Sequence, residues 1–227
     1  MTDQNNILKN MVIKLVACET ENEVVQVLTE EGYWNTNDGI WQPYGGVENN
    51  SGQIQAQSSD STSALVEKLT NSGDSLLMLE AYKRGINPKS NEAPQTMRSA
   101  LKEFFGYPNG SINEVGKDVI QKNSNNIGLI TTGNKSNPSY TIFDLGIGQT
   151  PIALPKTILS LGESNKDQIS FLQGVFNQGG SAALNFCSPN HRLQLVVSKQ
   201  HDLVKEKDAS SEYYGFTIVR REMPRPG

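Results

Sequence analysis

The stretch ALVEKLTNSGD, residues 64–74, decides how the rest of this chain is interpreted. Its spacing predicts a helix in which Glu67, Asn71 and Asp74 recur at i, i+4 and i+7 and therefore share one face. The apolar side chains on roughly the opposite face are Leu65, Leu69 and Leu76. The polar face carries an amide between two carboxylates, groups that bind metal ions or accept protons, and a solvated helix face is the alternative interpretation. The candidate N-caps are Ser61, Thr62 and Ser63.

A second motif, DLGIG at residues 144–148, follows an apolar run that ends at Phe143. The pattern predicts a strand that ends in a turn. A carboxylate at a strand end, here Asp144, can accept a hydrogen bond from the exocyclic amine of adenine. Gly146 and Gly148 would let the backbone approach a flat base closely. An ordinary strand-to-turn junction is the alternative.

A third motif, GVFNQGGSAAL at residues 174–184, predicts a glycine loop that opens a helix. A helix N-terminus presents free N–H groups and a positive dipole end to phosphate oxygens. Lys166, shortly upstream, adds a cation for the same phosphates, and a flexible surface loop is the alternative. The segment 128–136 resembles a P-loop but has one extra residue before its lysine, so we predict a hairpin turn there.

The helix motif suggests separate roles for Asn71 and Glu67 at a magnesium–nucleotide site. Mg²⁺ keeps several waters and takes few protein oxygens, so one amide oxygen from Asn71 suits it. Hydrolysis needs a base near the attacking water, and Glu67 lies one helical turn from Asn71.

Together and in this order, the motifs resemble the ATPase module of the GHKL superfamily, the Bergerat fold, and within it the hydrolysing branch of gyrase B, MutL and MORC proteins. The resemblance spans residues 63–220 and includes a last strand with Thr217, which would close the adenine pocket. It implies that Glu67 activates water and that Asn71 holds Mg²⁺. The other nucleotide-binding positions that it implies are Asp74, Asp144, Gly146, Gly148, Lys166, Gly174, Gly179, Gly180 and Thr217. A similar glycine lid occurs in bacterial stand-alone ATP-binding proteins, some of them encoded among phage-defence and restriction genes, which suggests a role in antiviral defence.

The expected fold is α/β, a Bergerat two-layer sandwich with a mixed, mostly antiparallel sheet and helices on one face. Residues 1–62 are expected to supply N-terminal helices and a lead-in strand, residues 63–221 the ATPase core, and residues 222–227 a linker to a further domain. Periodicity predicts further helices over 6–28, 96–105 and 112–120, and strands over 53–57, 127–132, 139–143, 192–199 and 214–220.

Composition narrows the class of protein. A net charge of −4 over 227 residues argues against a nucleic-acid footprint that spans the whole chain. Two cysteines make no disulfide framework, and His191 and His201 lack a partner at zinc spacing, so they are expected at the surface. No signal peptide and no apolar run of about 20 residues is present, so a cytoplasmic protein without a membrane partner is expected.

The leading hypothesis is therefore hydrolysis of ATP to ADP and phosphate, with lid closure that drives a conformational change or dimerisation. The expected ligands and partners are ATP, Mg²⁺, a second copy of the chain in a nucleotide-dependent homodimer, and a downstream effector domain or protein. DNA is a partner by analogy only. Related hydrolysing proteins take a lysine or arginine from a second domain, so turnover by this chain alone is expected to be weak. The alternatives are an ATP-gated switch with negligible hydrolysis and a histidine kinase, although neither histidine lies in a predicted helix.

Overall fold

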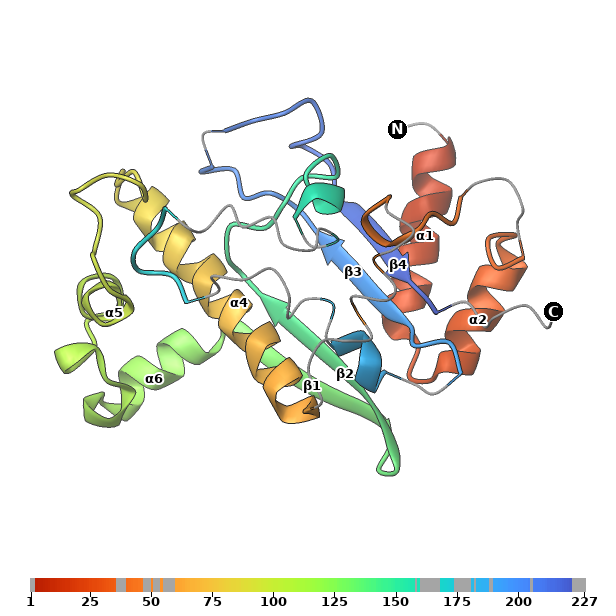
Figure 1. Ribbon diagram of the computed structural model, residues 1–227, viewed down its shortest axis with the longest axis horizontal. Coiled ribbons are helices and arrows are strands. Elements are labelled where there is room, and N and C mark those ends of the chain that lie inside the picture. Colours follow the sequence, from red (N-terminus) through yellow and green to blue (C-terminus); the bar gives the residue numbers. More distant parts are fainter. Residues whose placement is uncertain are drawn as a thin grey trace.

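The computed structural model describes residues 3–35, 40–46, 50, 54, 60–157, 159, 168–173, 181, 183–187, 190–204 and 206–221 (Figure 1). Its α-helices are α1 (Asp3–Ala17), α2 (Glu21–Glu30), α4 (Ser61–Lys83), α5 (Met97–Phe105) and α6 (Lys117–Ser124). Its strands are β1 (Ile127–Asn134), β2 (Asn137–Asp144), β3 (Gln194–Ser198) and β4 (Gly215–Val219). Short 3-10 helices lie at η1 (Tyr44–Gly46), η2 (Pro108–Gly110), η3 (Ile112–Glu114), η4 (Leu154–Lys156) and η5 (Ala183–Phe186).

The described strands pair as two separate two-stranded antiparallel sheets. β1 pairs with β2 and β3 with β4, and α4 crosses the β1–β2 pair in Figure 1. The expected α/β class is confirmed, whereas the single mixed sheet does not form among the described residues. The hairpin predicted in place of a P-loop is confirmed, because residues 127–134 form β1 and the chain turns directly into β2. The predicted strand over 53–57 falls almost wholly outside the described residues.

The N-terminal region is two helices that cover one face of the β3–β4 pair. Thr20 separates them, because its hydroxyl accepts from the Glu23 N–H while the Glu23 carboxylate accepts from the Thr20 N–H. The core of this region contains Met11, Leu15 and Leu28, against which the strand residues Leu195, Phe216 and Ile218 pack. One face of the β3–β4 pair is therefore occupied by α1 and α2.

An arginine between two tryptophans fastens the end of β4 to this region. The Arg220 guanidinium lies 4.6 Å from the ring centroid of Trp34 and 3.8 Å from that of Trp41. It also donates a 2.7 Å hydrogen bond to the Trp34 carbonyl oxygen. His191 meets the Trp34 ring edge-on at 4.9 Å and is half-buried, so only part of its side chain lies at the surface where it was expected.

The helix predicted from residues 64–74 is confirmed as α4 and continues to Lys83. The N-cap of α4 is Asp60, so the prediction of Ser61, Thr62 or Ser63 was wrong. The Asp60 carboxylate accepts hydrogen bonds from the N–H groups of both Thr62 and Ser63. A carboxylate there also complements the positive end of the helix dipole, which a serine or threonine hydroxyl does not. The buried residues of α4 lie around much of its circumference and are Ala64, Ser72, Asp74, Leu77, Leu79 and Ala81.

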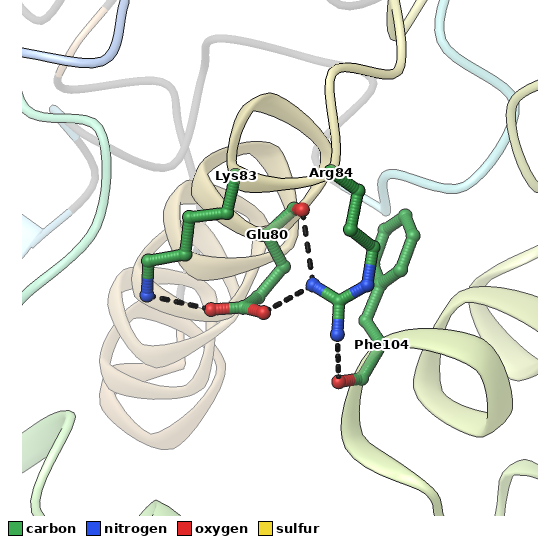
Figure 2. A network of polar contacts seen from close by, with 4 residues as sticks. All are labelled: Glu80, Lys83, Arg84 and Phe104. Carbon is green, nitrogen blue, oxygen red and sulfur yellow. Dashed lines mark hydrogen bonds and ion pairs between the residues drawn. The ribbon is translucent and has the colours of Figure 1, made fainter.

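The C-terminal end of α4 is fixed to α5 by a polar network (Figure 2). The Glu80 carboxylate pairs with Lys83 at 2.7 Å and with Arg84, whose guanidinium also donates to the Phe104 carbonyl oxygen at 2.7 Å and lies over the Phe104 ring. Burial opposes ionisation of Glu80, but the hydrogen bonds from Lys83 and Arg84 outweigh it and lower its pKa. Beneath this network, a second core contains Leu77, Ala81, Ala100, Phe104 and Phe171. The predicted helix over 96–105 is confirmed as α5.

Gly73→Ala is expected to stabilise the fold by about 1 kcal/mol, because a glycine within a helix is disfavoured and a Cβ at Gly73 meets nothing within 4 Å. Urea unfolding measures the change. The matched control is Gly106→Ala at the end of α5, where φ is +69° and an alanine is strained, so stability should fall by about 1 kcal/mol. A loss of stability in Gly73→Ala would show that α4 is not a continuous helix at this point.

Candidate functional site

The polar face of α4 is turned into the protein. Asp74 is only 1% exposed, and Glu67 and Asn71 are half-buried, so the alternative of a solvated helix face does not describe this helix. The Asp74 carboxylate accepts a 3.0 Å hydrogen bond from the backbone N–H of Gln173. Asp74 therefore ties α4 to the segment 168–173, and its predicted contact with a nucleotide stays a prediction.

The DLGIG turn lies directly on α4 beside this face. A Cβ on Gly146 would stand 2.6 Å from the backbone carbonyl carbon of Ser75, the residue that follows Asp74. The next residue, Ile147, donates its N–H to the Ser75 carbonyl oxygen at 3.2 Å. Two motifs that are far apart in the sequence are thus held in backbone contact.

The other side of the same turn lies on the end of β3. Gly148 has φ of +55°, and a Cβ there would stand 2.8 Å from the carbonyl carbon of Lys199. The Ile147 carbonyl oxygen accepts from the His201 N–H at 2.7 Å, and the Ser198 hydroxyl accepts from the Gln149 N–H at 2.9 Å. The turn therefore links α4 to β3 through backbone and short side-chain contacts.

These contacts change the interpretation of the two glycines. We predicted that they let the backbone approach a base, but the space of each missing Cβ is filled by protein, at Ser75 for Gly146 and at Lys199 for Gly148. Their role in the structure is close packing of the turn, and this packing positions Asp144.

The two carboxylate oxygens of Asp144 differ in their hydrogen bonds. Oδ1 accepts from the Gly146 N–H at 3.0 Å, which closes the turn. No group in the described part of the chain donates a hydrogen bond to Oδ2, and the side chain is half-buried. One oxygen of a positioned carboxylate is therefore available to a donor on a ligand.

Thr217 lies on the side of the β3–β4 pair that the turn occupies. It pairs with Val196, and because strand residues alternate between faces, both share a face with Ser198, which holds the turn. The opposite face contributes Leu195, Phe216 and Ile218 to the core under α1 and α2. Strand alternation thus places Thr217 on the face of the β3–β4 pair that meets the turn, and its contact with adenine stays a prediction.

A cationic cluster beside Glu67 was missed by the sequence analysis. The half-buried Lys68 follows Glu67 on α4, and burial lowers its pKa to about 8, against the opposing effects of Cys187 and Glu67. Burial raises the pKa of the Cys187 thiol, which therefore stays protonated at neutral pH. Arg192 also interacts electrostatically with Cys187, and its Nε is buried without a hydrogen bond among the described residues. The sequence does show a lysine next to the acid–amide face, which could have suggested this cluster. The environment of that lysine, however, includes Cys187, which is more than a hundred positions away.

The remaining predicted positions are not part of this geometry. Lys166, Gly174, Gly179 and Gly180 lie outside the described residues, as does the predicted linker over 222–227. Within the described ranges, no three histidine, cysteine, aspartate or glutamate side chains cluster as a metal site. Both cysteines are free and half-buried. Among the helices described, none combines the length and apolar character needed to cross a membrane.

No family model, curated protein or solved structure matches this chain. The assignment of chemistry to the site therefore depends on its residues and their arrangement.

Gly146→Ala is expected to destabilise the fold by about 1–3 kcal/mol, because the new Cβ meets the backbone of α4 and cannot be relieved by a side-chain rotation. Urea unfolding compares it with Gly73→Ala. That variant makes the same chemical change on α4, at a position where a Cβ meets nothing within 4 Å. Equal stability of Gly146→Ala and the wild type would show that the turn does not lie against Ser75.

Lys68→Met is expected to stabilise the fold at pH 7, by on the order of 1–3 kcal/mol, because it removes an ammonium that burial disfavours. The pKa of Lys68 is lowered on folding, so between about pH 8 and 10.5 the unfolded chain holds a proton that the folded chain has released. Wild-type stability therefore rises with pH across this window, and the advantage of the variant shrinks.

Urea unfolding at pH 7 and pH 10 measures both effects of Lys68→Met. Lys102→Met, on the exposed side of α5, is the control and should show neither. A less stable Lys68→Met at pH 7 would contradict the burial of the ammonium.

Proposed function

We propose that this chain binds ATP with Mg²⁺ and hydrolyses it to ADP and phosphate, as an ATPase of the GHKL type with a Bergerat-like arrangement. The observation that carries the proposal is the backbone contact between Gly146 and Ser75. The turn that carries Asp144 therefore lies next to the acid–amide face of α4, which supports a shared nucleotide site although neither motif alone is specific.

Asp144 is the group proposed to read the base. Its Oδ2 would accept a hydrogen bond from the exocyclic amine of adenine, while Oδ1 stays committed to the Gly146 N–H. Guanine carries a carbonyl oxygen at that position, which cannot donate to a carboxylate, so the same contact favours adenine. Thr217 would line this pocket from the β4 side.

Asn71 is the residue proposed to hold the metal ion. The described residues offer no cluster of acidic ligands, which fits Mg²⁺ bound mainly by phosphate oxygens and water with one amide oxygen from the protein. When bound, Mg²⁺ neutralises charge on the phosphate oxygens.

Glu67 is proposed as the general base. It would take a proton from the attacking water as the new P–O bond forms, while the bond from the terminal phosphorus to the bridging oxygen breaks and ADP leaves. Glu67 lies one helical turn from Asn71 on the inward face of α4, and its side chain is half-buried. A signal from the nucleotide state to a second copy of the chain or to an effector, including a role in antiviral defence, is part of the same proposal.

Asp144→Asn tests the nucleotide site. The amide oxygen of asparagine can still accept from the Gly146 N–H, so the fold should be unchanged, but its amide nitrogen cannot accept from adenine. Calorimetric titration with a non-hydrolysable ATP analogue should show magnesium-dependent binding by the wild type and about 10- to 100-fold weaker binding by the variant. Absence of binding by the folded wild type would refute the proposed site.

Glu67→Gln tests the reaction. It should lower steady-state phosphate release by about 100-fold or more while leaving the affinity for the analogue unchanged. Glu103→Gln, on the exposed side of α5, is the control and should behave as the wild type. Binding without phosphate release by the wild type would favour an ATP-gated switch, and unchanged release by Glu67→Gln would show that Glu67 is not the base.

A further inference from the structure

Lys68 and Arg192 both lie near Cys187, next to the proposed base Glu67. Both cations interact electrostatically with the Cys187 thiol, which is protonated at neutral pH and so adds no negative charge. Glu67 is the acidic group described as acting on Lys68, and Glu21 acts on Cys187 from α2 while accepting from the His191 N–H.

Neither cation forms an ion pair with a carboxylate in the described part of the chain. Lys68 makes no ion pair there, and its pKa is lowered mainly by burial. Arg192 donates from Nη1 to the Asn185 side-chain oxygen at 2.9 Å, a neutral acceptor, and its Nε has no acceptor among the described groups. A half-buried cation without an ion-pair partner costs free energy on folding, and such a cation is a candidate for a site that receives an anion.

The helix connects this cluster to the Asp144 turn. Lys68 and Ser75 are seven residues apart and therefore lie on one stripe of α4, separated by about 10 Å along the axis. Ser75 is the residue that contacts Gly146. A nucleotide with its base at Asp144 can therefore extend its phosphates along this stripe, past the acid–amide face, toward Lys68.

We propose that Lys68 and Arg192 form the subsite for the terminal phosphate of the nucleotide, so that this chain itself supplies the cations at the reacting phosphorus. The inference rests on the proposed function and goes beyond it, because it assigns recognition of the third phosphate to two named residues. The subsite distinguishes ATP from ADP, whereas Asp144 recognises the base that both nucleotides share.

The experiment is a titration of the non-hydrolysable ATP analogue and of ADP into the wild type, Lys68→Met and Arg192→Met. Each variant is expected to bind the analogue at least about tenfold more weakly and ADP within about twofold of the wild type. Lys68→Arg keeps the charge and should retain most of the affinity. Lys83→Met removes a charge from the exposed end of the same helix and should change neither ligand. If Arg192→Met does not fold, Arg192→Lys, which keeps the charge, is compared with Arg192→Gln.

Equal losses for both ligands, or no loss, would overturn the subsite. Inorganic tripolyphosphate separates this failure from failure of the proposed function. Nucleotide binding that is insensitive to both substitutions would leave the function standing without the subsite. Tripolyphosphate binding that depends on Lys68, in a wild type that binds no nucleotide, would show that Lys68 binds polyphosphate and would refute the proposed function. Absence of binding of any of the three ligands would refute both.

Discussion

The turn at residues 144–148 is held between α4 and β3, and the arrangement of the site depends on this contact. Ile147 is bonded through both of its backbone groups, to Ser75 on one side and to His201 on the other. The glycines on either side of it allow the approach, because a Cβ at either position would meet backbone. The separation between Asp144 and the polar face of α4 is thus set by backbone hydrogen bonds, which are less adaptable than contacts between long side chains.

The two apolar cores explain why polar groups collect at this contact. One core lies between α1, α2 and one face of the β3–β4 pair, and the other joins α4 to α5 and to Phe171. The apolar faces of β3, β4 and α4 are therefore packed into these two cores. The faces that carry Ser198, Thr217 and Asn71 lie in the region between the cores. Separate cores on either side also place the contact between the turn and α4 where two packed units meet.

Local patterns predicted the elements well, and contacts between distant residues were harder to foresee. The spacing of Glu67, Asn71 and Asp74 follows from helical periodicity, which neighbouring residues determine. The cap at Asp60 was missed because four consecutive residues can all cap a helix, and the choice depends on where the chain enters it. The burial of Lys68 and the hydrogen bond from Gln173 to Asp74 depend on segments about a hundred positions away, so no local pattern contains them. The pairing of strands into two sheets is non-local for the same reason.

The packing of Arg220 has a spectroscopic consequence. Trp34 and Trp41 are the two tryptophans of the chain, and both lie against this one guanidinium. Tryptophan emission therefore reports on the region where β4 meets the N-terminal helices, and it is silent about the core between α4 and α5. Far-UV circular dichroism reports on the helices of both cores. Coincidence of the two signals during unfolding would mean that the halves of the molecule melt as one cooperative unit, and separation would mean that the contact at Ile147 couples them only loosely.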